Sequence, residues 1–270
     1  MSLLLSNDDG VNAPGLAALA DELAVNHELR VIAPDRDRSG VSNGLTLDRP
    51  LQMSVLGNNY IAVDGTPTDC IHLGTAEIFM PLPKRVISGI NLGPNLGDDV
   101  LYSGTVAAAM EGRFLELPAL AVSLATTDIH GSINTDYFKT AAKITALLLE
   151  MLNAINVAPR TVFNINIPDL ALDRIKGVKL TVLGQRLRGE NPISVQNPRG
   201  KTLYWIGRAG GPVEAKQGTD FHAIDQGYIS LTPIHADMTS LDQFDAIARV
   251  VDASMANWQH KLDTLLEKVS

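Results

Sequence analysis

Residues 3–10 have the sequence Leu-Leu-Leu-Ser-Asn-Asp-Asp-Gly, and this stretch decides the fold. The three leucines predict a short buried strand, and the polar residues that follow place two carboxylates, Asp8 and Asp9, at its end. Two like charges at the edge of an apolar core are costly unless a cation lies between them or water reaches them freely. The pair therefore indicates a divalent cation, although Asn-Asp-Asp-Gly is also typical of a solvated turn.

The next segments predict an α/β fold. Apolar residues at helical spacing follow Pro14, and residues 29–34 predict a second buried strand that Pro34 ends. Strand, helix and strand in this order form a βαβ unit, which implies a parallel sheet. Further strands are expected at 85–90, 119–124 and 161–168, and a helix from about 137 to 152.

Composition excludes several classes of protein. The 270 residues carry a net charge of -8, which argues against a protein that binds nucleic-acid polymers. The one cysteine, Cys70, permits no internal disulfide, so a reducing compartment, the cytoplasm, is expected. The first residues lack the basic start of a signal peptide, and no apolar run is long enough for a membrane span.

The sequence predicts three parts. Residues 1–176 form the core, and residues 177–235 form a β-rich appendage with a return strand to the core. In this second part no clear helix is expected, and its last strand, 228–233, is expected to end at Pro233. Residues 236–270 contain an amphipathic helix, from about 240 to 265, which is expected to contact another subunit or the core.

Polar residues also follow two other predicted strands. Ser39 and Gly40 come after the second strand, and Asn91 ends the strand that begins at Arg85. Because the carboxyl ends of parallel strands meet at one sheet edge, these residues are expected close to Asp8 and Asp9. Hydroxyl, amide and carboxylate oxygens suit Mg²⁺ or Mn²⁺. Taken alone, residues 35–40 are more typical of an ordinary charged loop.

An anion site is expected beside this cation site. Ser103, Gly104 and Thr105 precede an alanine-rich helix, whose first N–H groups can bind an anion; a plain serine N-cap is the alternative. The strand at 161–168 carries Asn164 and Asn166 on one face, where they either support loops or satisfy backbone groups. A hard cation next to an anion site is the arrangement that phosphate-ester hydrolysis requires.

Several motifs together resemble the SurE (survival protein E) family of metal-dependent nucleotidases, and the resemblance spans nearly the whole chain. They are S-N-D-D-G at 6–10, R-S-G at 38–40, S-G-I-N-L-G-P-N at 88–95, Y-S-G-T-V-A-A-A-M-E-G at 102–112 and G-Y-I-S-L-T-P at 227–233. The resemblance implies a Rossmann-like core with one Mg²⁺ or Mn²⁺ ion per subunit. The implied metal ligands are Asp8, Asp9, Ser39 and Asn91. The residues implied around the phosphate are Gly40, Asn95, Ser103, Gly104 and Thr105.

The resemblance also implies an activity and an assembly. The expected reaction is hydrolysis of nucleoside 5′- and 3′-monophosphates, and of short polyphosphate, in homodimers or homotetramers joined by the appendage and the C-terminal helix. In the expected mechanism Asp8 and Asp9 are catalytic and a metal-activated water attacks phosphorus. An aspartyl-phosphate on Asp8 is the competing mechanism. The competing class is a non-catalytic metal and nucleotide sensor of the receiver type, but that fold has no β-appendage.

Overall fold

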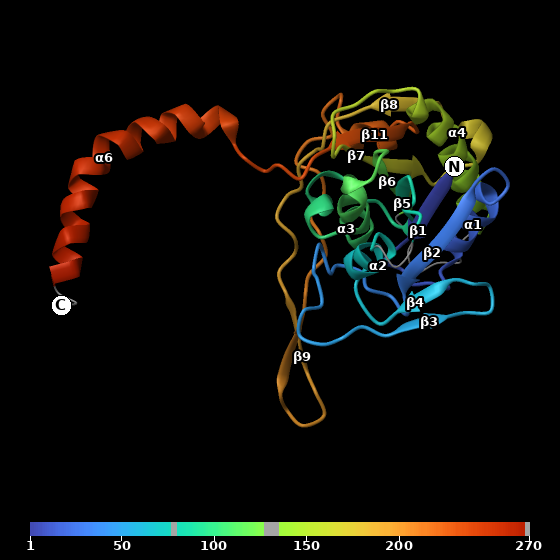
Figure 1. Cartoon of the computed structure of the whole chain (residues 1–270), viewed down its shortest axis with the longest axis horizontal. Helices are drawn as coiled ribbons and strands as arrows, with labels where there is room; N and C mark the ends of the chain where they lie inside the picture. The colour runs from blue at the N-terminus through green and yellow to red at the C-terminus, as the bar shows by residue number, and fades with distance from the viewer. Residues whose placement is uncertain (77–79, 127–134, 268–270) are drawn as a thin grey trace. The chain divides into compact units, whose positions relative to one another are not determined.

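The computed structural model describes residues 1–76, 80–126 and 135–267 (Figure 1). The chain divides into two compact units, Met1–His235 and Ala236–Ser270. The predicted α/β fold with a mostly parallel sheet is confirmed in the first unit. The division into three functional parts stays a prediction, and residues 268–270 of the third part lie outside the described residues.

The first unit is built on a nine-stranded sheet in the order β3-β4-β2-β1-β5-β6-β7-β11-β8. Its strands are β1 (Ser2–Ser6), β2 (Glu28–Pro34), β3 (Met53–Val55), β4 (Ile61–Val63), β5 (Arg85–Leu92), β6 (Ala119–Ala125), β7 (Val162–Pro168), β8 (Val178–Leu180) and β11 (Ile229–Ile234). Its helices are α1 (Pro14–Leu23), α2 (Pro67–Gly74), α3 (Gly104–Glu111), α4 (Thr135–Asn153) and α5 (Asp220–Asp225). Short 3₁₀ turns are η2 (Gly97–Leu101), η3 (Gly112–Phe114) and η4 (Leu172–Arg174).

The central strands are parallel, and this fixes where the site lies. β1 pairs in parallel with β2 and β5, and the parallel pairing continues through β6 to β7. Only β3 and β11 pair antiparallel to a neighbour in this sheet, among the residues that the structure describes. The carboxyl ends of β1, β2, β5, β6 and β7 therefore share one edge, which is the edge where α/β proteins bind ligands.

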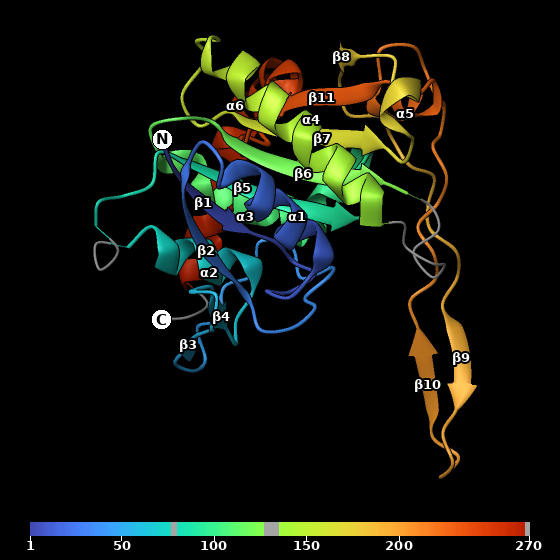
Figure 2. The same ribbon diagram turned by 90° about the vertical axis from the view of Figure 1, so that its right-hand side faces the viewer.

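Helices cover both faces of the sheet. Figure 2 shows α1 and α4 in front of the strands and α2 and α3 behind them. Successive leucines of β1 point to opposite faces, so Leu3 and Leu5 pack in the cluster with α1 and α4, and Leu4 packs in the cluster with α2 and α3. All three are fully buried. Each contributes about 1.5–3 kcal/mol of transfer free energy, so this strand anchors both halves of the core.

Helix α2 shows how local sequence sets an element. Thr66 is its N-cap and accepts a hydrogen bond from the Asp69 N–H, while the Asp69 carboxylate accepts from the Thr66 N–H, so a complete capping box is present. Pro67 occupies the first helical turn. Cys70 then lies fully buried, as expected of a structural cysteine.

Two expectations for residues 177–235 are wrong. The helix α5 lies at Asp220–Asp225, and its six residues are too few to show a helical period. Strand β11 continues through Pro233 to Ile234, because it pairs antiparallel with β7 on one side while β8 pairs only with its first half. Proline is tolerated where the strand has no partner for its missing N–H.

The hairpin of β9 (Ile193–Gln196) and β10 (Thr202–Trp205) extends away from the sheet, as Figure 2 shows. Both of its faces are exposed, including Tyr204, Trp205 and Ile206. The second unit contains the helix α6 (Leu241–Glu267), which exposes large apolar side chains between Leu241 and Leu262. None of the described helices is long and apolar enough to cross a membrane.

Candidate active site

Asp8 lies just beyond the end of β1 and is buried. One of its carboxylate oxygens, Oδ1, accepts a hydrogen bond from the Thr105 hydroxyl in the first turn of α3. The preceding residue, Asn7, is also buried and closes the turn by donating from Nδ2 to the Gly10 carbonyl at 2.9 Å. The turn chemistry read from the sequence is therefore present, and it aims the Asp8 carboxylate at the start of α3.

Asp9 connects β1 to the neighbouring strand β5. Its Oδ2 accepts a hydrogen bond from the Leu92 N–H at 3.2 Å. Burial, together with the negative charge of Asp8, raises the pKa of Asp9 to about 7. Burial also raises the pKa of Asp8, although the bonds from Thr105 oppose that shift. Both carboxyl groups thus lie where a negative charge is poorly compensated by the protein.

The charge balance fits a divalent cation. Asp37 adds a third negative charge that raises the pKa of both Asp8 and Asp9. None of the ion pairs found among the described residues involves Asp8 or Asp9. The Asn7 Oδ1 oxygen is buried beside them with no hydrogen-bond partner among the described groups. A hard cation would supply the missing positive charge, and oxygen donors are the ligands it prefers.

The structure brings the other predicted ligands to the same edge. The Arg38 N–H donates to the Asp8 carbonyl at 2.8 Å, which holds the loop that carries Ser39 beside β1. Ser39 and Gly40 are exposed, and the Ser39 hydroxyl donates to Asp37 at 2.7 Å. Asn91 lies near the end of β5 and donates from Nδ2 to the Gly93 carbonyl at 2.8 Å, so its Oδ1 is the amide atom suited to a cation.

Asp37 is a neighbour of the site that the sequence did not single out. Its carboxylate holds both the N–H and the hydroxyl of Ser39, each at 2.7 Å. The sequence signal was its position in the same polar loop, but a charged loop contains several such residues, and only the fold brings this one near Asp8. Among the described residues, no three His, Cys, Asp or Glu side chains are grouped to hold a metal, so a cation here needs serine or asparagine oxygens as well.

Helix α3 begins against Asp8. The Ser103 hydroxyl accepts from the Val106 N–H at 3.1 Å, so the N-cap alternative is correct for this side chain. A side chain in place of Gly104 would put its Cβ 2.7 Å from the Asp8 Cβ, so only glycine permits this approach. The first N–H groups of a helix have no partner within it, and here the backbone N–H of Thr105 is a hydrogen-bond donor to Asp8.

Asn95 is fixed in the loop between β5 and α3 and is buried. Its N–H donates to Asn166 Oδ1 at 2.8 Å, and its carbonyl accepts from Asn164 and Asn166 at 2.8 and 3.0 Å. Its own Nδ2 donates to the Ser123 hydroxyl at 2.8 Å. Both alternatives for the β7 asparagines therefore hold, because they satisfy backbone groups and, in doing so, support a loop at the site edge.

Comparison with known proteins decides the family. The model of the family "Survival protein SurE" matches residues 3–190. The chain belongs to the SurE family. Curated relatives named "5'-nucleotidase SurE" include those of Pseudomonas aeruginosa (strain UCBPP-PA14), 53% identical over 247 residues and covering 92% of this chain and 97% of the relative. That of Ectopseudomonas mendocina (strain ymp) is 55% identical over 239 residues, covering 88% and 94%.

A solved structure agrees with this membership. The crystal structure of the SurE protein from Aquifex aeolicus superimposes with a TM-score of 0.77 at 40% identity, covering 93% of this chain and 99% of that one. The resemblance drawn from the motifs at 6–10, 38–40, 88–95, 102–112 and 227–233 is thus confirmed. The roles of individual residues in the SurE site stay predictions.

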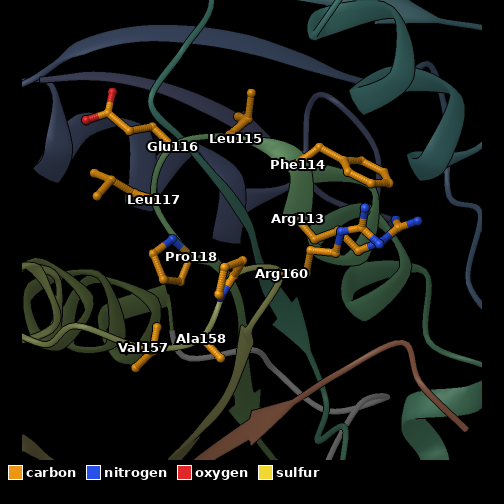
Figure 3. Close-up of a pocket in the computed structure, with 10 residues that line it drawn as sticks. Arg113, Phe114, Leu115, Glu116, Leu117, Pro118, Val157, Ala158 and Arg160 are labelled. Atoms are coloured by element: carbon orange, nitrogen blue, oxygen red, sulfur yellow. The ribbon is translucent and has the colours of Figure 1, made fainter.

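A pocket of this SurE chain lies elsewhere on the first unit. Its volume is about 400 Å³. Residues 113–118 and 157–160 line it, as Figure 3 shows. These segments precede β6 and β7, so the cavity lies at the opposite sheet edge from Asp8. Arg113 donates to the Met110 carbonyl at the end of α3, and Arg160 lies over the Phe114 ring at 5.2 Å. These arginines have structural partners, and the cavity brings together none of the predicted SurE site residues.

The contact between Gly104 and Asp8 gives a prediction. Gly104→Ala is expected to lower phosphatase activity about 100-fold, because the added methyl forces Asp8 or the first turn of α3 to move. Gly57→Ala is the matched control, since Gly57 lies in the β3–β4 turn with open space around it. Steady-state kinetics of both folded variants make the comparison. Wild-type activity in Gly104→Ala would contradict a role in activity for the close contact between Gly104 and Asp8.

Proposed function

We propose that this chain is a metal-dependent phosphatase that hydrolyses nucleoside 5′-monophosphates to nucleoside and phosphate. One observation carries the proposal: the buried carboxylate of Asp8 and the half-buried one of Asp9 lie at the carboxyl edge of the sheet, against the N-terminus of α3, and neither has a cationic partner among the described residues. The relatives' name, 5′-nucleotidase, supports the same substrate class. The receiver-type sensor is not favoured.

The residues divide into two groups. Asp8, Asp9, Ser39 and Asn91 would hold one Mg²⁺ or Mn²⁺ ion, which supplies positive charge to the phosphoryl group and lowers the pKa of bound water. Gly40, Asn95, Ser103, Gly104 and Thr105 would surround the phosphate. The first-turn N–H groups of α3 are suited to the charge that develops on the phosphoryl oxygens.

Thr105 has a second task in this arrangement. Its hydroxyl donates to Asp8 Oδ1, which fixes the orientation of the Asp8 carboxylate. Asp9 is held in the same way by the Leu92 N–H at its Oδ2. Both carboxylates are thereby held in defined orientations, which prepares the site before a ligand arrives.

We further propose hydrolysis of nucleoside 3′-monophosphates and short polyphosphate, homodimers or homotetramers, and a cytoplasmic location. Exposed apolar side chains on the β9–β10 hairpin and on α6 support an oligomer, since such patches mark interaction sites. Trp205 is 69% and Phe244 60% exposed in the single chain. The lone, buried Cys70 supports a reducing compartment.

A panel of substrates tests the function. Purified protein is assayed for phosphate release from 5′- and 3′-monophosphates of each nucleoside and from polyphosphate, with Mn²⁺, with Mg²⁺ and with no metal. Turnover of 5′-monophosphates only in the presence of metal is expected. Binding without release of phosphate would favour the sensor and sink the proposal. The configuration at phosphorus of a chiral substrate separates direct attack by water, which inverts it, from an aspartyl-phosphate on Asp8, whose two displacements retain it.

A further inference from the structure

Asp220 is a buried acidic residue that the proposed chemistry does not use. It is fully buried at the start of α5, yet both of its carboxylate oxygens accept backbone hydrogen bonds. Oδ2 accepts from the Gly97 N–H at 2.7 Å, and Oδ1 accepts from Gly184 and Phe221, each at 2.9 Å. One side chain thus joins three segments: the loop before α3, the base of the appendage and α5.

The three segments are closely packed against one another. A Cβ at Gly97 would lie 2.6 Å from the Gly184 carbonyl oxygen and 2.7 Å from the Phe221 ring. A Cβ at Gly184 would lie 2.4 Å from the same ring. Gly97 also has a φ of 55°, which favours glycine. Glycines at both contact points allow Asp220 to reach both backbones, so the junction is built into the sequence.

Arg186 makes a second connection a few residues away. Its guanidinium donates to both carboxylate oxygens of Asp99, at 2.6 and 2.5 Å, and to the Gly210 carbonyl at 2.8 Å. Its backbone N–H donates to Asp98 at 2.7 Å. These hydrogen bonds connect both sides of the base of the appendage, at Arg186 and Gly210, to η2.

The connected loop leads directly to the proposed phosphate site. The Asp99 carbonyl accepts from the Ser103 N–H at 3.0 Å, and the Leu96 N–H donates to the Asp99 carboxylate at 3.2 Å. Gly97 to Asp99 therefore form the bridge between Asn95 and Ser103. The β7 asparagines fix the Asn95 end of this bridge, and Asp220 and Arg186 fix its middle and its Ser103 end.

We propose that Asp220 and Arg186 are positioning residues for the phosphate group of the substrate. They hold the loop 95–103 against the base of the appendage and so set the distance between Asn95 and the first turn of α3. The proposed metal ligands Asp8 and Asp9 follow β1, outside this loop. Loss of the connection therefore weakens phosphate binding more than cation binding. This inference rests on the proposed function.

The test is Asp220→Asn, which keeps the shape of the side chain but places an amide where two oxygens accept N–H donors. We expect KM for a nucleoside 5′-monophosphate and the inhibition constant of inorganic phosphate to rise about 10- to 100-fold. The dissociation constant of Mn²⁺, from titration of the same folded protein, should change less than about twofold. Asp225→Asn is the matched control, since Asp225 is exposed on the same helix and bonds Gln226.

Arg186 variants keep the test decisive if Asp220→Asn does not fold. Arg186→Met should raise the phosphate constant in the same way, and Arg186→Lys should restore part of the affinity, because lysine keeps the charge but lacks the fork. Unchanged phosphate binding in folded variants, or an equal loss of Mn²⁺ and phosphate affinity, would overturn the positioning role. An inactive wild-type chain would overturn the proposed function instead. Titration with inorganic phosphate would still show whether Asp220 and Arg186 position the loop for phosphate binding.

Discussion

Asp9→Asn is expected to lower kcat/KM for a nucleoside 5′-monophosphate by about 1,000-fold or more, equivalent to about 4 kcal/mol of transition-state free energy. The amide removes one of the two charges that we assign to holding the cation. It also leaves an N–H₂ or a neutral oxygen where the carboxylate stands, and both are weaker ligands for Mg²⁺ or Mn²⁺. Steady-state kinetics over a range of metal concentrations measure the loss.

The same variant should be more stable than the wild type when metal is absent. The pKa of Asp9 in the folded protein, about 7, lies above its value in an unfolded chain, about 3.9. Ionisation of Asp9 therefore destabilises the folded state progressively as pH rises from about 4 to about 7, and at about pH 8 the full penalty is present. Asparagine carries no such penalty, so the Tm of metal-free Asp9→Asn should exceed the wild-type Tm at about pH 8.

Asp21→Asn serves as the control, because Asp21 is exposed on α1. It should change neither activity nor Tm appreciably. Full metal-dependent activity in Asp9→Asn would sink the assignment of this residue. A fall in both activity and metal-free Tm would instead show that Asp9 is needed for the fold.

Removal of divalent metal with EDTA is expected to abolish phosphate release, and added Mn²⁺ or Mg²⁺ to restore it. The apparent metal affinity should also increase with pH, because a proton on Asp9 competes with the cation. For each proton displaced, the affinity rises about tenfold per pH unit below the pKa and levels off above it. For Asp9 the affinity should therefore level off near pH 7, because the pKa of Asp9 is about 7 in the metal-free protein.

Titration of Mn²⁺ between about pH 5.5 and pH 8.5 tests this directly. The number of protons displaced follows from the slope. Asp9→Asn should bind the ion more weakly and with a slope reduced by one proton, whereas Asp21→Asn should reproduce the wild-type curve. A metal affinity independent of pH below 7 would mean that the cation does not displace a proton from Asp9.

Much of the fold could be predicted from short stretches of sequence. The leucines at 3–5 and the strands at 29–34 and 119–124 are largely apolar segments, as buried parallel strands are. The strand at 161–168 has apolar residues at alternate positions. Thr66, Pro67 and Asp69 set a helix start through contacts within four residues. Asp8, Asp9 and Asn91 could be placed at one edge because parallel strands all end on the same side.

Other features depend on contacts between residues far apart in the chain. Helix α5 is too short to show a helical period in the sequence. Asp220 accepts a hydrogen bond from Gly97, which lies 123 positions away in the chain. Asn166 reaches Asn95 across 71 positions. No local sequence pattern indicates which of many aspartates or asparagines contacts a given loop. The contacts of Asp220 and Asn166 with the loop before α3 therefore could not be predicted before the fold was known.

Residues 3–10 show which features depend on local sequence and which depend on the tertiary structure. By itself the sequence determined that a buried strand ends in two carboxylates, because hydrophobicity and turn chemistry act over a few residues. Only the tertiary structure decided that Thr105 holds Asp8, that Leu92 holds Asp9 and that Asp37 adds a third charge. The reason is that burial, and with it the raised pKa of Asp9, arises only when distant segments exclude water from the same edge of the sheet.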